Sequence, residues 1–177
     1  MKHDFNLIPF GDRPSPEIEI VGFISRNRDR LDIQYQLRAN LSKIIIPQPT
    51  PTPSRQYDLW EHTCFELFLR PKNTTKYWEF NLSPAGDWNV FHLTDYRQNM
   101  REETAIVALP FEVFPTTKFL QLTSNFDLSS IIKPEQNIDV AITTVVENKE
   151  RELSYWALTH KAIAPDFHHP DSFILSL

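Results

Sequence analysis

Hydrophobic and polar residues alternate along most of this chain, which is the pattern of strands with one buried face. Residues 30–38 (RLDIQYQLR) place four apolar side chains, Leu31, Ile33, Tyr35 and Leu37, on one face and polar side chains on the other. Residues 17–25 (EIEIVGFIS) alternate in the same way, and the NRDR segment between the two runs is typical of a turn. The sequence therefore predicts a β-hairpin over residues 17–38.

The alternation continues through the rest of the chain. Residues 62–70 (HTCFELFLR) and 76–83 (KYWEFNLS) form a second pair of predicted strands, joined by a PKNTT turn. Further strands are predicted at residues 88–93, 104–109, 118–126, 137–146, 152–159 and 172–176. A short helix is a candidate only near DYRQNMREE, residues 95–103, because no other stretch carries a 3.6-residue apolar stripe. About ten short strands with at most one short helix predict an all-β, antiparallel β-sandwich of the jelly-roll or immunoglobulin-like type.

A proline-rich segment, PQPTPTPSR, interrupts the strands with prolines at positions 47, 49, 51 and 53. It could be a linker between two domains or a loop on the surface of one. The 46 residues before it would form only two or three strands, too few for a separate hydrophobic core. We therefore expect a surface loop and one domain over residues 1–177.

Composition limits the classes of protein that the chain can belong to. With 177 residues, 41% of them hydrophobic, it can bury a full core. Its single cysteine, Cys64, excludes an internal disulfide and a Cys-based zinc site, and indicates a reducing compartment. The first residues lack the apolar run of a signal peptide, and no run of 18 apolar residues exists, so we expect a cytoplasmic protein without a membrane span. A net charge of −5 without a basic cluster argues against a nucleic-acid partner.

Sequence motifs of common enzyme classes are absent. The chain has no G-x-G-x-x-G, P-loop, G-x-S-x-G or H-E-x-x-H motif, and three glycines leave little material for a phosphate-binding loop. Aromatic and polar residues concentrate instead in two stretches, residues 59–93 and 154–173.

These two stretches carry a resemblance to a known family. The resemblance lies in the blocks LWEHTCFELFL, YWEFNLSPAGDWNVFHL, DYRQNM, YWALTH and PDFHHPDSFIL. The chain resembles the DOMON-like β-sandwiches related to type 9 carbohydrate-binding modules, and more closely the small stand-alone bacterial branch of that group. The resemblance spans residues 15–177. It implies two sheets of about five antiparallel strands and a ligand held on a sheet face or at a sandwich edge.

The resemblance also implies a ligand site. Type 9 modules hold a sugar between two tryptophans with a glutamate nearby, and the matching positions here are Trp60, Trp156 and Glu66. A pyranose ring offers apolar C–H faces to aromatic rings, while its hydroxyls need a carboxylate or guanidinium partner in a largely dry slot. Arg97 is the candidate guanidinium.

The residues themselves leave some alternatives open. Trp78 is in register with Phe80 and Leu82, so we expect it in the core, whereas Trp60 and Trp156 could each be an exposed platform or a buried side chain. Glu79 and Asn81 lie on the polar face beside Glu66, where a carboxylate pair could serve acid and base catalysis. Nothing else in the chain marks a substrate cleft, so we expect no enzymatic activity.

Metal and haem sites are weaker alternatives. The candidate metal ligands are His160, Asp166, His168 and His169, but prolines flank the two adjacent histidines, and we expect a loop in which these side chains cap backbone groups. Calcium would need a denser run of Asp and Asn. Haem would need an axial pair such as Met and His, and the two methionines, Met1 and Met100, are not in apolar strands. We therefore expect no cofactor.

The sequence supports two main hypotheses. The first is non-catalytic binding of a sugar or sugar derivative by Trp60, Glu66 and Trp156, with Glu79, Asn81 and Arg97 as secondary candidates. The second is a protein–protein interaction module that uses the same sheet face, which fits a cytoplasmic location. A metal- or haem-binding DOMON protein is a third.

Overall fold

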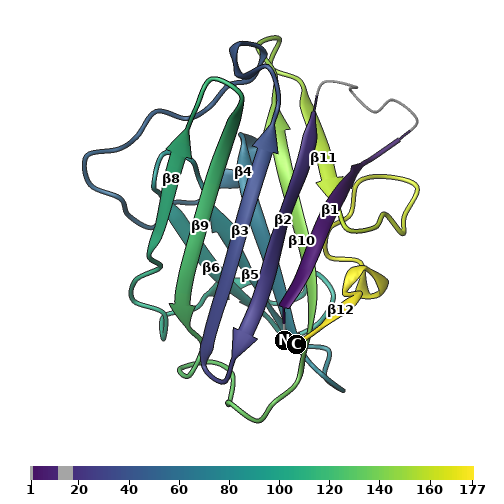
Figure 1. Ribbon diagram of the computed structural model, residues 1–177. Coiled ribbons are helices and arrows are strands. Elements are labelled where there is room, and N and C mark those ends of the chain that lie inside the picture. Colours follow the sequence, from purple (N-terminus) through teal and green to yellow (C-terminus); the bar gives the residue numbers. More distant parts are fainter. Residues whose placement is uncertain (1, 12–17) are drawn as a thin grey trace.

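Two antiparallel β-sheets pack face to face in the computed structural model, which describes residues 2–11 and 18–177 (Figure 1). The front sheet contains, in spatial order, β8 (Phe111–Pro115), β9 (Phe119–Asp127), β3 (Arg30–Arg38), β2 (Glu19–Asn27) and β1 (Lys2–Pro9). The back sheet contains β7 (Arg101–Glu102), β6 (Trp88–Leu93), β5 (Tyr77–Leu82), β4 (Cys64–Pro71), β10 (Ile138–Glu147) and β11 (Leu153–Ala157), while β12 (Leu175–Ser176) pairs with β10. The predicted all-β antiparallel sandwich is confirmed.

Strand β1 connects the two sheets at one side of the sandwich. Most of it pairs with β2, but its last two residues pair with β11, through Ile8 with Ala157 and Pro9 with Trp156. The backbone N–H of Phe10 continues this contact by donating to the carbonyl of Tyr155 at 2.8 Å. The sheets therefore share an edge here, which fixes the position of β11 in the back sheet.

The core lies between the sheets and is made by the inward-facing half of each alternating pattern. The front sheet contributes buried side chains such as Ile20, Ile24, Leu31, Ile33, Leu37 and Leu122, and the back sheet contributes Phe65, Leu67, Leu69, Phe80, Val90, Val140 and Ile142. Trp78 belongs to this core, as predicted. The buried hydroxyl of Tyr35 donates to the carbonyl of Glu66 at 2.7 Å, a hydrogen bond from one sheet to the other.

Gly22 of β2 lies close to the backbone of β3 and to the Phe5 side chain of β1. A Cβ atom at this position would lie 1.9 Å from the carbonyl oxygen of Gln34 and 2.6 Å from Cζ of Phe5. Glycine is therefore required where β2 passes between β3 and the Phe5 ring.

The structure corrects several details of the prediction. The described residues form twelve strands rather than about ten, because β1 and the short β7 were not predicted, and the predicted strand at 104–109 is replaced by β8 at Phe111–Pro115. Residues 95–103 form no helix, since Arg97 and Asn99 have positive φ angles and Arg101–Glu102 is a strand. The helical elements of the described residues are three short 3₁₀ helices, at Leu41–Lys43 (η1), Leu59–Glu61 (η2) and Pro170–Ser172 (η3). Residue 17, the first of the predicted hairpin, lies outside the described residues.

The proline-rich segment runs over the surface beside the turn between β5 and β6. The N–H of Thr50 donates to the carbonyl of Ala85 at 2.8 Å, and the N–H of Ser54 donates to Oδ1 of Asp87 at 2.9 Å. These hydrogen bonds hold the segment as a surface loop against the back sheet.

The outer face of the back sheet is also covered, which the alternation did not predict. A second cluster of buried side chains lies there, formed by Phe68, Tyr77, Phe91, Leu93, Ala141 and Phe173, with Trp60 and Phe167 packed against it. Three segments supply the cover: residues 57–63 with η2, the loop 94–100, and the C-terminal segment 158–174. This covered face is where the candidate site lies.

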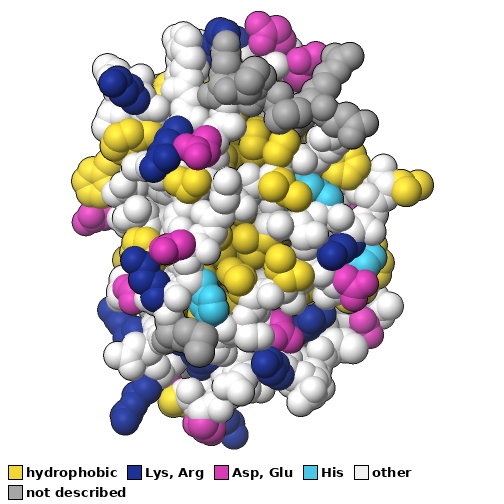
Figure 2. Space-filling model, turned by 45° about the vertical axis from the view of Figure 1, so that its right-hand side comes forward, with side chains coloured by type: hydrophobic (Ala, Val, Ile, Leu, Met, Phe, Trp, Pro, Cys, Tyr) yellow, Lys and Arg dark blue, Asp and Glu magenta, His cyan; other side chains and the backbone are white. Residues whose placement is uncertain are grey.

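The side of the molecule that carries β1 shows a mixed surface. Figure 2 shows Lys and Arg interspersed with Asp and Glu around a group of hydrophobic side chains. Among the described residues, no helix has the length and apolar character needed to cross a membrane.

Candidate functional site

A pocket of about 390 Å³ lies between the outer face of the back sheet and its covering segments. Strands β4, β5, β10 and β11 form its floor, and residues from η2, the 94–100 loop and the C-terminal segment form its walls. The lining residues are Trp60, Glu61, Glu66, Phe68, Glu79, Arg97, Met100, Val145, Leu153, Tyr155, Pro165, Phe167 and His168. Because two acidic side chains on the floor dominate its chemistry, we refer to it as the carboxyl pocket.

The floor of the carboxyl pocket holds Glu66 and Glu79. The antiparallel register pairs Glu66 with Asn81 and Phe68 with Glu79, so the two glutamates come from neighbouring strands and share the outer face. They are only 2% and 4% exposed, respectively. The structure therefore places two acidic side chains in a nearly dry environment.

The two carboxyl groups differ in their hydrogen bonds. One oxygen of Glu66 accepts from the hydroxyl of Thr143 on β10 at 2.8 Å. Oε1 of Glu79 accepts from the side-chain amide of Asn81 at 2.9 Å. The other oxygen of Glu79, Oε2, is buried and has no hydrogen-bond partner among the described residues. A buried polar atom without a partner in a pocket wall indicates that a ligand group can bind there.

Burial controls the protonation of this pair. Desolvation, reinforced by the charge of Glu79, raises the pKa of Glu66 to about 8, against the lowering effect of the Thr143 hydrogen bond. Desolvation also raises the pKa of Glu79 to about 7, although the Asn81 hydrogen bond and the charge of Arg97 oppose it. The pair therefore holds protons near neutral pH, when ordinary glutamates have released them.

His168 forms the wall beside Glu79. Its Nδ1 lies 2.8 Å from the Tyr77 hydroxyl, and its Nε2 lies 3.7 Å from Oε2 of Glu79, beyond hydrogen-bond distance. Burial and the nearby charge of Arg97 lower the pKa of His168 to about 4, although Asp166 opposes the shift. The imidazole is therefore neutral at neutral pH and leaves the carboxyl without a cationic partner.

Arg97 lies at the rim of the pocket and is bound to Asp166. The guanidinium donates to Oδ1 of Asp166 at 2.8 Å, and the hydroxyl of Tyr96 donates to the other carboxylate oxygen at 2.7 Å. Burial favours the neutral form of Asp166, but these two hydrogen bonds outweigh it and lower its pKa. The positive charge of Arg97 is thus paired with Asp166 at the rim rather than with a glutamate on the pocket floor.

Aromatic rings form the remaining walls. Trp60 packs edge-on against Phe91, with 5.9 Å between ring centroids, and remains partly exposed. Tyr155 on β11 and Phe167 on the C-terminal segment are 6.0 Å apart in a similar edge-on arrangement. The pocket therefore combines aromatic side chains in its walls with an acidic floor.

Trp156 does not line this pocket, so the pairing of Trp60 with Trp156 expected from the resemblance is wrong. The Trp156 ring is 3% exposed and belongs to the core between the sheets, where its Nε1 donates to the hydroxyl of Ser154 at 3.0 Å. Successive side chains of a strand point to opposite faces. Its neighbour Tyr155 therefore takes the place in the pocket that the sequence assigned to Trp156.

The structure brings four of the six predicted ligand-binding residues to the pocket lining: Trp60, Glu66, Glu79 and Arg97. Asn81 is fully buried and acts through its hydrogen bond to Glu79 rather than by facing the pocket. Sequence reasoning missed Tyr155 and Phe167, and it considered His168 as a metal ligand or as a cap of backbone groups rather than as part of a sugar site. In the register of β11 with β10, Tyr155 lies opposite Val145, another lining residue, and no signal in the sequence alone gives this register.

The four candidate metal ligands make other contacts. Nε2 of His160 lies 2.9 Å from the carbonyl of Ile8, and Nδ1 of His169 accepts from the backbone N–H of Asp171 at 3.2 Å. Asp166 and His168 form the contacts described above. Within the described part of the chain, no three His, Cys, Asp or Glu side chains are grouped to hold a metal ion. Met1 lies outside the described residues, and Met100 is a half-exposed rim residue.

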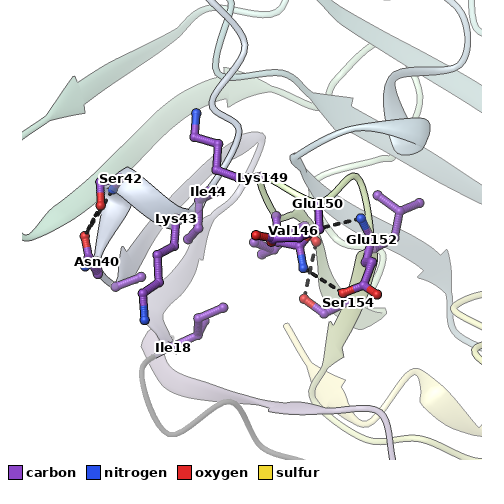
Figure 3. Close-up of a pocket in the computed structure, with 13 residues that line it drawn as sticks. Ile18, Asn40, Ser42, Lys43, Ile44, Val146, Lys149, Glu150, Glu152 and Ser154 are labelled. Carbon is purple, nitrogen blue, oxygen red and sulfur yellow. Dashed lines mark hydrogen bonds between the residues drawn. The ribbon is translucent and has the colours of Figure 1, made fainter.

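A larger pocket of about 740 Å³ opens elsewhere, between the end of β3 with η1 and the turn that joins β10 to β11. Figure 3 shows Ile18, Lys43 and Ile44 on one side of it and Glu150, Glu152 and Ser154 on the other. None of its described lining residues is aromatic, and none of the described buried polar atoms without a partner belongs to it. The carboxyl pocket is therefore the better candidate site.

No protein-family model matches the sequence, and no curated protein matches it. Solved structures do match the fold. A candidate carbohydrate-binding protein from Bacteroides uniformis is 11% identical with a TM-score of 0.72, covering 97% of this chain and 84% of that chain. A family 9 carbohydrate-binding module from Caldicellulosiruptor kristjanssonii in complex with glucose is 10% identical with a TM-score of 0.50, covering 82% and 69%.

The same kind of module from that organism in complex with cellotriose is 7% identical with a TM-score of 0.52, covering 88% of this chain and 72% of that chain. The TM-scores show a shared fold, and at these low identities they show the fold alone. The structural matches support a fold related to type 9 carbohydrate-binding modules. The likeness to DOMON domains stays a prediction.

Proposed function

We propose that this chain binds a sugar or a sugar derivative in the carboxyl pocket, without catalysing a reaction on it. The observation that carries the proposal is Oε2 of Glu79, a buried atom of a pocket-lining residue that has no hydrogen-bond partner among the described residues. A sugar hydroxyl can supply the missing donor, and the C–H faces of a pyranose can pack on Trp60 and Tyr155.

The size of the pocket and the fold support the same ligand class. About 390 Å³ is within the range of sites for small molecules, which is roughly 300–1,000 Å³. Two proteins with this fold are carbohydrate-binding modules in complex with glucose and cellotriose. Glucose and short glucans are therefore the first ligands to test.

A protein-interaction module is less well supported. That hypothesis needs an open aromatic face on the back sheet, whereas the described covering segments bury Phe68, Tyr77 and Phe91. A cytoplasmic location and the absence of a cofactor stay predictions from the sequence.

Titration of the full chain with sugars tests the proposal. We expect glucose or cellotriose to give a saturable signal in isothermal titration calorimetry at millimolar concentration or below. Trp60→Ala should weaken binding about tenfold, which corresponds to about 1.4 kcal/mol. Tyr57→Ala is the matched control, because Tyr57 also packs on Phe91, at 5.6 Å between centroids, but does not line the pocket.

Two outcomes would contradict the proposal. The first is the absence of binding to any sugar of a mono- and oligosaccharide panel by folded wild-type protein at millimolar ligand. The second is an equal loss of affinity in Tyr57→Ala and Trp60→Ala, which would place the ligand outside the carboxyl pocket.

A further inference from the structure

The floor of the carboxyl pocket holds two acidic groups, Glu66 and Glu79, and neither is paired with a lysine or arginine of the described residues. In the described residues, no Lys or Arg forms an ion pair with Glu66 or Glu79, and the closest basic atom, Nε2 of His168, is 3.7 Å from Glu79. Arg97 directs its charge to Asp166 at the rim. An acidic floor of this kind lacks the counter-charge that buried carboxylates normally have.

Other groups around the pair do not supply that charge. The titratable groups around the pair on the outer face are Cys64 from β4, Tyr77 from β5, and Arg97 and His168 from the covering loops, with Asp166 and Glu61 at the rim. Tyr35 from β3 lies on the other side of the sheet, in the core, and donates to the backbone carbonyl of Glu66. Burial raises the pKa values of Tyr35, Cys64 and Tyr77 and lowers that of His168, so these four are neutral at neutral pH. The negative charge of Glu66 and Glu79 is therefore neutralised either by protons or by a ligand.

We propose that the ligand of the carboxyl pocket carries a protonated amine, which binds against Glu66 and the unpartnered Oε2 of Glu79. The inference rests on the proposed function, and it narrows the ligand to an amino sugar with a free amino group, such as a hexosamine. An ammonium group has three N–H donors and no acceptor, so it can satisfy acceptors on both carboxyls, and the resulting hydrogen bonds are charge-assisted.

The pocket walls favour an organic cation over a metal ion. Trp60 and Tyr155 line the space above the carboxyls, and aromatic faces attract ammonium groups. A metal ion would need a third protein ligand, which the described residues do not group here. Ammonium binding displaces the protons that the two carboxyls hold in the free protein, so the ligand and protons compete for the same oxygens.

The test compares sugars that differ in charge but hardly in shape. Glucosamine, glucose and N-acetylglucosamine are titrated into the full chain by calorimetry at pH 6.5, in two buffers of different ionisation enthalpy. We expect glucosamine to bind at least tenfold more tightly than glucose and N-acetylglucosamine. We also expect its binding to release protons to the buffer, up to about one per ligand, while glucose releases none.

Variants test the role of the carboxyls. Glu79→Gln should reduce the preference for glucosamine over glucose to within about threefold, and Glu66→Gln should act in the same direction. Glu112→Gln, an exposed glutamate on β8, is the matched control and should leave the preference unchanged. Thermal melts establish that each variant is folded, and glutamine preserves the shape of the side chain.

Failure of this inference can be distinguished from failure of the proposed function. If glucosamine binds no more tightly than glucose, the proposed ammonium site is wrong, but the proposed sugar binding is still supported. Cyclohexylamine and cyclohexanol provide a second matched pair without sugar hydroxyls. Binding of cyclohexylamine alone, with no sugar bound, supports the ammonium site and overturns the sugar proposal, and no binding by any of these compounds overturns both.

Discussion

The hydroxyl of Tyr77 lies 2.8 Å from Nδ1 of His168, a residue 91 positions later in the chain. The same hydroxyl accepts a hydrogen bond from the backbone N–H of Arg97 at 3.2 Å. We therefore assign its own proton to the bond with Nδ1, which leaves the imidazole proton on Nε2, toward Glu79. One side chain of β5 thus holds both the C-terminal segment and the 94–100 loop over the back sheet.

Removal of this hydroxyl should loosen the cover of the pocket. Tyr77→Phe leaves His168 Nδ1 and the Arg97 N–H without their partner, and we expect the free energy of unfolding to fall by about 1–3 kcal/mol. Sugar affinity should fall with it, because the His168 wall loses its support. Urea denaturation measures the first effect and calorimetric titration the second.

Tyr96→Phe is the control for this prediction. Tyr96 also donates a hydroxyl hydrogen bond to the C-terminal segment, at Asp166, but its side chain is 41% exposed, and water can replace the bond. We expect a loss below about 1 kcal/mol. An equal effect of the two variants would show that the Tyr77 contact has no special role.

The acidic floor of the pocket makes stability depend on pH. Burial raises the pKa of Glu66 to about 8 and that of Glu79 to about 7, from an ordinary value of 4.5. The folded protein therefore keeps protons that the unfolded chain releases, so this stabilisation is full below about pH 4.5 and is lost as the pH rises through 7 and 8. Because a tenfold change in proton affinity corresponds to about 1.4 kcal/mol, we expect urea denaturation to show a fall of a few kcal/mol in the free energy of unfolding.

His168 sets the pH range in which this effect is isolated. Its pKa in the folded protein is about 4, below its ordinary value of 6.5, so its contribution to stability increases with pH up to about 6.5 and is constant above. The fall between pH 6.5 and 8 then belongs to the carboxyls. The double variant Glu66→Gln/Glu79→Gln should abolish it, Glu112→Gln should retain it, and a flat wild-type profile would contradict the raised pKa values.

Strand alternation was enough to predict most of the fold. The hairpin of β2 and β3 and the positions of β4, β5, β6, β9 and β10 follow from a two-residue alternation bounded by turn residues. Strand β1 also alternates, with Phe5 and Leu7 buried and Asp4 and Asn6 outward, but proline and glycine follow so closely that the segment did not stand out. The helix predicted at residues 95–103 failed because left-handed residues, which a helix cannot contain, occur there at Arg97 and Asn99.

The site was predictable only where one face of a strand was clearly polar. Glu66 and Glu79 alternate with an unambiguous apolar stripe, so their shared face could be predicted from the sequence. Residues 152–159 carry apolar side chains on both faces, so the sequence could not show whether Tyr155 or Trp156 pointed outward. The covering segments bring in Phe167 and His168 through contacts far apart in the sequence, which periodicity does not encode.

The two neighbouring aromatic residues of β11 should therefore differ in what their substitution changes. Tyr155 lines the pocket, so Tyr155→Ala should weaken sugar binding about tenfold and cost about 1 kcal/mol of stability. Trp156 packs in the core and donates to Ser154, so Trp156→Phe should lower the free energy of unfolding by about 2 kcal/mol and leave the affinity of the folded protein within about threefold. Urea denaturation and calorimetry on both variants measure the two quantities separately. Loss of binding in folded Trp156→Phe, with Tyr155→Ala unaffected, would restore the tryptophan pair predicted from the sequence and contradict the pocket described above.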